Sequence, residues 1–96
     1  MPARGVAGWM RPRGDRRGGD DFRHIGDVVG VYELIARSGP VYTQATRNLR
    51  SSIQQHLDEG DIPACDFRAW QLRSYRVALR VARIRIDRYE PYYNIT

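Results

Sequence analysis

Arginine is the residue type in this sequence whose number and placement could do chemistry. The chain of 96 residues has sixteen arginines and no lysine, so every strong positive charge is a guanidinium. A guanidinium is planar and permanently charged, and its fork of N–H donors fits phosphate oxygens and carboxylates. A GC-rich genome also favours arginine codons over lysine codons, but codon usage does not explain where the arginines lie. The composition therefore predicts that the chain holds a polyanion or joins an assembly.

The arginines gather on either side of an acidic middle. Residues 1–23 carry a net charge of +3, residues 24–67 a net charge of −3, and residues 68–88 a net charge of +6. Such a distribution is typical of a protein with a nucleic-acid or assembly partner. The arginines that we expect to contact nucleic acid are Arg4, Arg11, Arg13, Arg16, Arg17, Arg23, Arg73, Arg76, Arg80 and Arg83.

The first group of arginines lies in an N-terminal arm, residues 1–22, that is rich in glycine. Pro2, Pro12 and five glycines within the first 20 residues oppose a helix. We expect this arm to be extended, to be disordered alone and to order against a partner. Trp9 is a candidate anchor of the arm onto a neighbouring molecule.

Three helices are predicted to carry the residues that follow, which makes the expected fold all-α. The first, 24–37, has apolar residues at spacings of three and four. The second, 40–59, and the third, 63–88, each open on a proline, a residue favoured at the first helical position. A competing interpretation makes Val77–Tyr89 a strand, because isoleucines alternate there with charged residues. We expect a helical domain over 23–90 and a short extended tail over 91–96.

The third predicted helix should separate its charged and apolar side chains. Four of its arginines fall in one arc of about 80° and span about 15 Å of the axis: Arg73, Arg76, Arg80 and Arg83. Duplex nucleic acid carries one negative charge per about 1.7 Å of its axis, so this row can grip several phosphates from one side. Apolar side chains cover about 240° of the same helix, more than two short helices can bury. We therefore expect self-association through Trp9, Phe67, Trp70, Leu72, Tyr75, Leu79, Val81 and Ile86.

Catalytic and metal-binding chemistry finds little support in the sequence. Ser51, His56 and Asp58 lie close together, but on a helix Ser51 points away from His56. We interpret His56 as a residue at the edge of the core. No Gly-rich phosphate loop follows a strand, and Cys65 with two histidines cannot build a metal cluster or an internal disulfide. We therefore predict that the chain is not an enzyme and takes no metal and no cofactor.

Four features succeed one another along the chain: the basic arm Met1–Arg17, Gly39-Pro40 followed by Tyr42, the break at Gly60 to Pro63, and Arg73-Ser74-Tyr75. This order resembles the helical coat proteins of rod-shaped and filamentous viruses of hyperthermophilic archaea, over residues 25–80. The resemblance implies an all-helical protein, two copies of which clasp DNA held in A-form. It also implies that Arg73, Arg76 and Arg80 face phosphate while the arm wraps the duplex.

The segment Val28-Val29-Gly30-Val31-Tyr32, followed by Leu34 and Arg37, is similar to the start of the first helix in the LYR-motif proteins of mitochondria. Glu33 stands where that motif has arginine. This second resemblance implies a three-helix accessory subunit of a large complex.

Two functional hypotheses follow from the sequence. The first is a structural coat or packaging subunit of a virion, which self-assembles and binds the backbone of nucleic acid, double-stranded DNA in particular, without reading its sequence. The alternative is a small accessory subunit of a mitochondrial respiratory complex or of a cytoplasmic ribosome, with arm and tail packed on neighbouring subunits. No apolar run approaches the roughly 18 residues of a membrane span, and the N-terminus lacks the apolar core of a signal peptide.

Overall fold

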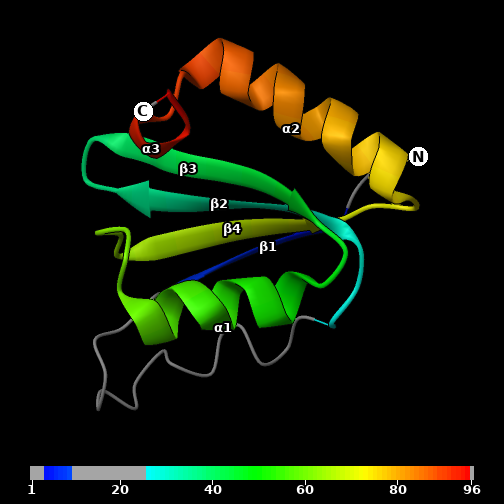
Figure 1. The fold of residues 1–96 in the computed structure, drawn as a ribbon, viewed down its shortest axis with the longest axis horizontal. Helices are drawn as coiled ribbons and strands as arrows, with labels where there is room; N and C mark the ends of the chain where they lie inside the picture. Colours follow the sequence, from blue (N-terminus) through cyan, green and yellow to red (C-terminus); the bar gives the residue numbers. More distant parts are fainter. Residues whose placement is uncertain (1–3, 10–25, 96) are drawn as a thin grey trace.

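The computed structural model of the chain is a mixed α/β domain in which an antiparallel sheet lies between helices (Figure 1). It describes residues 4–9 and 26–95, and side chains from residue 26 to residue 94. The described elements are β1 (Arg4–Trp9), β2 (Gly30–Ala36), β3 (Gly39–Thr46), α1 (Leu49–Glu59), β4 (Asp66–Gln71), α2 (Tyr75–Tyr89) and α3 (Tyr92–Ile95). The strands β4, β2 and β3 lie side by side and β1 adds to the outer edge of β4, so that the order is β1-β4-β2-β3. Every neighbouring pair is antiparallel.

The strand β2 is central and is covered on both of its faces. Five consecutive residues, 30–34, are buried, including the carboxylate-bearing Glu33. A β-carbon added at Gly30 would lie 2.1 Å from the carbonyl oxygen of Trp70 and 2.7 Å from Cδ1 of Leu49. Glycine at this position therefore lets β2 lie against β4 while α1 packs close by.

The strand β3 forms the other edge of the sheet and reaches β2 through a tight hairpin. Gly39 has a φ of 117°, a backbone conformation that glycine adopts without strain. A bulge between Leu34 and Ile35 shifts the register of β2 and β3. Asn94 of α3 contacts the backbone of Thr43: its Oδ1 accepts from the Thr43 N–H at 2.7 Å, and its Nδ2 donates to the Thr43 carbonyl at 2.8 Å.

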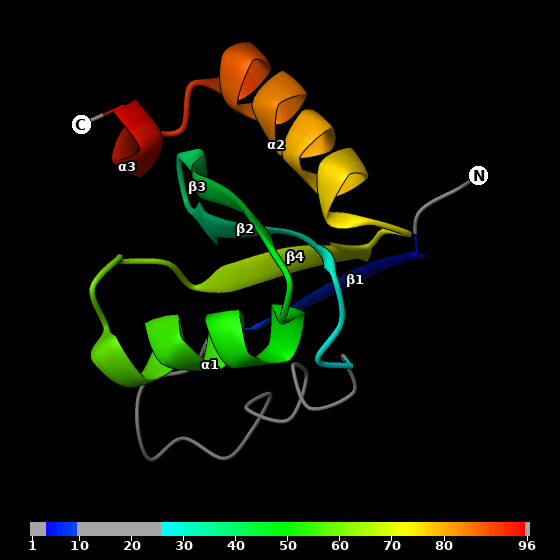
Figure 2. The ribbon, with the colours of Figure 1, turned by 45° about the vertical axis from the view of Figure 1, so that its right-hand side comes forward.

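The helices α1 and α2 lie on opposite sides of the sheet (Figure 2). Leu49 and Ile53 of α1 pack on Leu34 and Phe67, all of them nearly inaccessible to solvent. On the other face, two alanines of α2 pack on two small residues of the sheet, forming a second cluster of Val31, Ala45, Ala78 and Ala82. Alternate residues of one strand point to opposite faces, which is how β2 contributes to both clusters.

The helix α1 is held at its N-terminus by a residue from outside the helix. The preceding Asn48 makes no side-chain capping hydrogen bond. Instead, the carboxylate of Asp27 accepts from the N–H of Ser51 at 3.0 Å and from its hydroxyl at 2.7 Å. Both bonds lower the pKa of Asp27 below its usual value. Gly60, with a φ of 60°, ends the helix in the left-handed conformation.

The expected all-α fold is wrong. The segment 24–37, predicted as a helix, contains strand β2 instead. The prediction was wrong because a strand buried on both faces has a continuous apolar run without alternation, and such a run does not distinguish a strand from a helix. The helix predicted over 40–59 begins only at Leu49, and its first part is the edge strand β3. Pro40 opens that strand rather than a helix, a place where an edge strand tolerates proline.

The long helix predicted over 63–88 is also wrong in its first part. Residues Asp66–Gln71 form β4, in which Phe67 and Ala69 alternate with exposed or half-buried residues. The helix α2 starts at Tyr75, because Ser74 caps it by accepting from the N–H of Val77 at 3.2 Å. The strand considered for Val77–Tyr89 is wrong as well, since this segment lies in α2.

At the N-terminus the described part of the arm is extended, as predicted, but it pairs within the chain, and the C-terminal tail differs from the expected extended form. Residues Arg4–Trp9 of the predicted arm form β1 and pair with β4 in register from Arg4↔Gln71 to Trp9↔Asp66. The tail, expected to be extended, contains the short helix α3. The all-helical architecture that both family resemblances imply is therefore not the architecture of this chain.

Candidate nucleic-acid interface and polar pocket

The outward side of α2 carries a row of arginines. The arginine face consists of Arg76, Arg80 and Arg83 on the helix, together with Arg73 just before its capping serine. All four residues are exposed, and the opposite side of the helix buries Ala78 and Ala82. At a rise of about 1.5 Å per residue, Arg76 and Arg83 lie about 10 Å apart along the axis.

Among the described residues, the arginine face has a single acidic partner. Arg83 forms an ion pair with Asp87 at 3.4 Å, and both side chains are more than 60% exposed, so the pair contributes little to stability. Within residues 4–9 and 26–95, Arg73, Arg76 and Arg80 make no ion pair. Three exposed guanidiniums of this face therefore have no acidic partner within the part of the chain that the structure describes.

Arg85 differs from these arginines because it turns inward and binds the sheet. Its Nη2 donates to Oε1 of Glu33 at 3.1 Å, and its Nε makes a second, shorter bond to Oε2 of the same carboxylate. Glu33 is completely buried and also accepts from the hydroxyl of Thr43 at 3.2 Å. The guanidinium lies 4.7 Å from the ring centroid of Trp70 and 5.0 Å from that of Tyr89. The hydrogen bonds to Glu33 raise the pKa of Arg85 above its ordinary value.

The Glu33–Arg85 pair fixes how α2 sits on the sheet. A buried carboxylate is costly unless it is paired and hydrogen-bonded, and here it receives bonds from both Arg85 and Thr43. The pair ties the middle of α2 to the central strand β2, next to the small side chains of Ala78 and Ala82. The exposed arginines are consequently carried by a helix with a defined rotation.

Arg47 extends positive charge toward the start of α2. Its guanidinium carbon lies 4.1 Å from the ring centroid of Tyr75, the first residue of that helix. Arg47 is exposed and directly follows Thr46, the last residue of β3. This cation–π contact places the end of β3 beside the N-terminal end of the arginine face.

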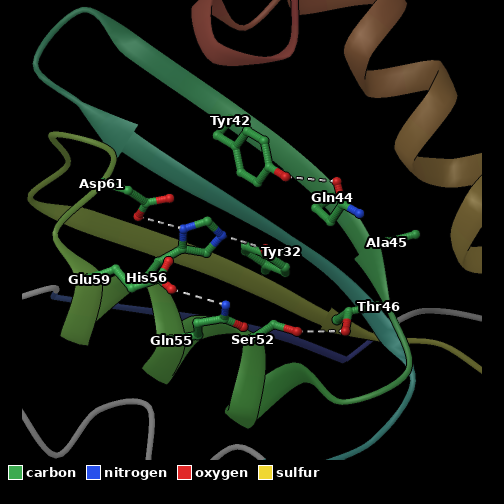
Figure 3. Close-up of a pocket in the computed structure, with 10 residues that line it drawn as sticks. All are labelled: Tyr32, Tyr42, Gln44, Ala45, Thr46, Ser52, Gln55, His56, Glu59 and Asp61. Atoms are coloured by element: carbon green, nitrogen blue, oxygen red, sulfur yellow. Dashed lines mark hydrogen bonds and ion pairs between the residues drawn. The ribbon is translucent and has the colours of Figure 1, made fainter.

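A polar pocket of about 330 Å³ lies on the other side of the sheet, between α1 and the edge strand β3 (Figure 3). Its lining consists of aromatic, amide, hydroxyl and carboxylate side chains: Tyr32, Tyr42, Gln44, Ala45, Thr46, Ser52, Gln55, His56, Glu59 and Asp61. None of these residues is an arginine. The pocket therefore differs in charge from the face of α2.

A hydrogen-bonded chain of three side chains crosses the pocket. The hydroxyl of Tyr32 lies 2.8 Å from Nε2 of His56, and Nδ1 of His56 lies 3.0 Å from Oδ1 of Asp61. His56 is 14% exposed and Asp61 is 43% exposed, so the chain runs from the core to the surface. Both ring nitrogens of His56 are engaged, which fixes its orientation.

Aromatic rings form one wall of the pocket. The ring centroid of Tyr42 lies 5.2 Å from that of His56, in an edge-on arrangement, and 6.1 Å from that of Tyr32. The Tyr42 hydroxyl donates to Oε1 of Gln44 at 2.9 Å. Burial raises the pKa of both tyrosines above the ordinary value, so both phenols are neutral at physiological pH.

The pocket is better suited to binding than to phosphoryl transfer. A phenol, an imidazole and a carboxylate in a row are typical of a nucleophile, its base and the group that orients the base. Here, however, the raised pKa of Tyr32 disfavours the phenolate. Catalysis at phosphorus also requires positive groups around the developing charge, whereas Glu59 and Asp61 bring negative charge to this pocket.

Neither a metal site nor a membrane span is found in the described part of the chain. Among residues 4–9 and 26–95, no three histidine, cysteine, aspartate or glutamate side chains meet in a group that could hold a metal ion. Of the helices that the structure describes, none is long and apolar enough to cross a bilayer.

The arginines predicted to bind nucleic acid are divided between described and undescribed parts of the chain. The four arginines of residues 73–83 come together on the arginine face. Arg4 lies on β1, and its side chain is not described. The remaining predicted arginines lie outside the described residues: Arg11, Arg13, Arg16, Arg17 and Arg23.

The residues predicted to form an assembly interface are mostly used within the chain itself. Phe67 is fully buried in the core beneath α1. Five others are half-buried: Trp70, Leu72, Tyr75, Val81 and Ile86. Leu79 is 49% exposed and is available to a partner. Trp9 lies on β1, and its side chain is not described.

Sequence reasoning missed the pocket and the Glu33–Arg85 pair. Ser51 points away from His56, as expected, and binds Asp27. His56 is more than a residue at the edge of the core, because it joins Tyr32 of β2 to Asp61 beyond α1. The bonded residues are 24 and 52 positions apart in the two sites, and no local spacing in the sequence signals such contacts.

No protein-family model, curated protein or solved structure shows a significant match to this chain.

Proposed function

We propose that this protein binds the backbone of nucleic acid, without reading its sequence, through the arginine face of α2, and that it acts as a structural subunit rather than as an enzyme. The observation that carries the proposal is the exposure of Arg76 and Arg80 on one side of α2, with Arg73 just before its cap, all without acidic partners in the described chain. Planar guanidiniums fit phosphate oxygens as well as carboxylates, and the backbone of nucleic acid presents phosphates in a row.

The geometry of the face supports contact with several phosphates at once. Arg76 and Arg83 are separated by about 10 Å along α2, and a duplex presents one negative charge per about 1.7 Å of its axis. The Glu33–Arg85 pair holds the helix in one orientation, so the arginines need little ordering when they bind. Contacts of this kind go to phosphates and position the protein, but carry no sequence information.

The distribution of acidic residues also favours binding from one side. Two carboxylates lie at or after the end of α1, on the opposite side of the sheet from α2: Glu59 and Asp61. These groups repel phosphate, whereas the arginine face attracts it. A polyanion should therefore approach the molecule over α2.

A packaging or coat role extends this proposal by self-association. Leu79 and Ile84 lie on the two sides of the arginine face at about 3.6 residues per turn, and they are 49% and 60% exposed. Two apolar side chains beside a phosphate-binding row can join neighbouring copies that share one nucleic acid. Copies of the chain would then line up along the duplex through α2.

The test is the salt dependence of binding to a labelled 20-base-pair duplex, measured by fluorescence anisotropy. If the four arginines neutralise four phosphates, log K should fall against log salt with a slope of about −3.6 from this face. The double variant R76Q/R80Q should lower the affinity and reduce the magnitude of the slope by about 1.8.

The matched control is R37Q/R50Q, which removes the same charge from exposed arginines on the β2–β3 turn and on α1. It should change the slope by much less than R76Q/R80Q does. Equal effects of the two double variants would refute the arginine face as the binding site. Duplex binding that is absent or insensitive to salt would refute nucleic-acid binding and favour the accessory-subunit hypothesis.

A further inference from the structure

The polar pocket between α1 and β3 has hydrogen-bonding groups left over for a ligand. Oε1 of Gln44 accepts from Tyr42, but the amide nitrogen of Gln44 has no partner among the residues that the structure describes. Within the same residues, one oxygen of Glu59 and one oxygen of Asp61 are likewise unengaged. Within these residues the amide oxygen of Gln55 is unengaged as well, so the pocket offers one donor group and three acceptors to a molecule that enters it.

These groups suit a planar, neutral ligand that has both donors and acceptors at its edge. We propose that the pocket binds one unpaired nucleobase of a nucleic acid held at the arginine face. Proteins recognise unpaired bases by stacking them on aromatic rings and by hydrogen-bonding their exposed edges. Half-buried Tyr42 supplies the ring, and Gln44 with the two carboxylates supplies the edge contacts.

The charge of the pocket favours a base over a phosphate. Glu59 and Asp61 lie on its lining and no arginine does, so a phosphate would meet negative charge there. The same carboxylates accept hydrogen bonds from the amino and imino groups of a base. A volume of about 330 Å³ lies within the range of pockets that take small ligands.

A short path along the chain and one side-chain contact lead from the pocket to the arginine face. Thr46 lines the pocket, and Arg47 follows it in the chain. The Arg47 guanidinium lies over the ring of Tyr75, which precedes Arg76 of the arginine face. One strand could thus have a base in the pocket and its phosphates along Arg47 and Arg76. The inference rests on the proposed backbone binding, since a single base contact would not hold a strand alone.

The test compares two fluorescein-labelled 12-mers: oligodeoxycytidylate, whose base carries an amino group for the carboxylates and acceptors for the Gln44 amide, and a 12-mer of abasic nucleotides with the same number of phosphates. Fluorescence anisotropy at one salt concentration should show the base-bearing strand binding about tenfold more tightly to the wild-type chain. The variants Y42A and Q44A should bring that ratio close to one while the abasic strand binds as before. R76Q/R80Q should weaken both strands and keep the ratio.

Y92A is the matched control for Y42A, because Tyr92 is 65% exposed on α3 and contacts the ring of Tyr93 instead of the pocket. It should leave the ratio at its wild-type value. If Y42A fails to fold in a thermal melt, Q44A carries the test alone, since Gln44 is exposed on β3.

Several results would overturn the inference separately from the proposed function. Equal affinity of the wild type for the two strands, with dependence on Arg76 and Arg80 retained, would overturn base binding and leave backbone binding intact. A ratio unaffected by Q44A would do the same. If Q44A or Y42A instead altered only the oligomeric state in sedimentation, the pocket would be a docking site for an arginine of a second copy. Loss of dependence on the arginines would overturn the proposed function itself.

Discussion

The two faces of the sheet are packed with different kinds of side chain. Beneath α1 the core consists of large apolar side chains such as Leu34, Phe67 and Ile53. Beneath α2 the fully buried apolar residues are small, larger side chains such as Trp70 and Leu72 pack half-buried around them, and the Glu33–Arg85 pair adds a directional contact. The first face gains its stability from the area removed from water, whereas the second combines a smaller buried apolar cluster with one buried carboxylate and its donors. The comparison indicates that α1 supplies bulk stability and that α2 is positioned by a directional contact.

The largest expected loss of stability comes from removing the carboxylate beneath α2, and it tests whether the two faces are packed differently. Glu33→Ala should lower the free energy of unfolding by about 3 kcal/mol, because it removes the partner of Arg85 and leaves a cavity beside Thr43. This figure is at the low end for a buried pair, since the Arg85 side chain is 25% exposed. Urea denaturation measures the loss.

The double variant Glu33→Leu/Arg85→Met gives a control for that experiment. An apolar pair of similar volume should recover most of the stability lost in Glu33→Ala, as replacement of buried ion pairs often does. A Glu33→Ala variant as stable as the wild type would show that α2 packs by apolar contact alone, and the two faces would then be alike.

A smaller loss of stability is expected from a substitution at Gly30 of β2, the strand that contributes to both clusters. Gly30→Ala should destabilise the chain by about 1–3 kcal/mol, because the new methyl group would lie 2.1 Å from the Trp70 carbonyl oxygen and 2.7 Å from Leu49. The strand β2 must move away from β4 to relieve this contact. The change should appear in thermal melts together with faster hydrogen exchange of the β2 and β4 amides. Gly60→Ala adds a carbon with no atom within 4 Å but at a φ of 60°, so it measures the backbone cost of losing a left-handed glycine separately from the steric clash at Gly30.

The smallest effect is expected at Asp27, which binds the start of α1 and whose contribution to stability depends on pH. The pKa of Asp27 is lowered by its hydrogen bonds to Ser51, so its contribution to stability is present above the unfolded pKa, about 3.9, and is lost as pH falls through the lower folded value. Asp27→Asn should therefore have a lower melting temperature than the wild type at pH 7. The difference should shrink as the pH is lowered toward 2. A difference that stays constant with pH would show that the charge of Asp27 is unimportant.

Local properties of the sequence were predictable and distant contacts were not. Arg76, Arg80 and Arg83 were placed on one side of a helix from their spacing alone, and the structure has them exposed together on α2. Their exposure depends only on the helical repeat and on which side is apolar. The partner of Arg85 lies 52 residues away on β2, and its identification requires the sheet topology.

The fold was predicted wrongly where the spacing of buried residues in a strand is the same as the spacing expected for a helix. Residues 30–34 of β2 are buried on both faces and show no alternation, so their pattern does not distinguish a strand from a helix. In β3, Tyr42 and Ala45 stand three residues apart, a spacing typical of one face of a helix, although they belong to opposite faces of the strand. The β-branched residues Val29, Val31 and Val41 were the signal that favoured strands.

The contact between Asn94 and Thr43 has a consequence for how copies of this chain can meet. The free edge of β3 presents backbone groups that could accept a strand from another molecule. At Thr43 the side-chain amide of Asn94 satisfies both the N–H and the carbonyl, as a neighbouring peptide would. A strand added there would have to displace α3, so growth of the sheet into a ribbon of many copies is blocked at this residue. A second copy that pairs with this part of β3 should therefore bind only when α3 has moved away, so that strand pairing at this edge is coupled to release of the last helix.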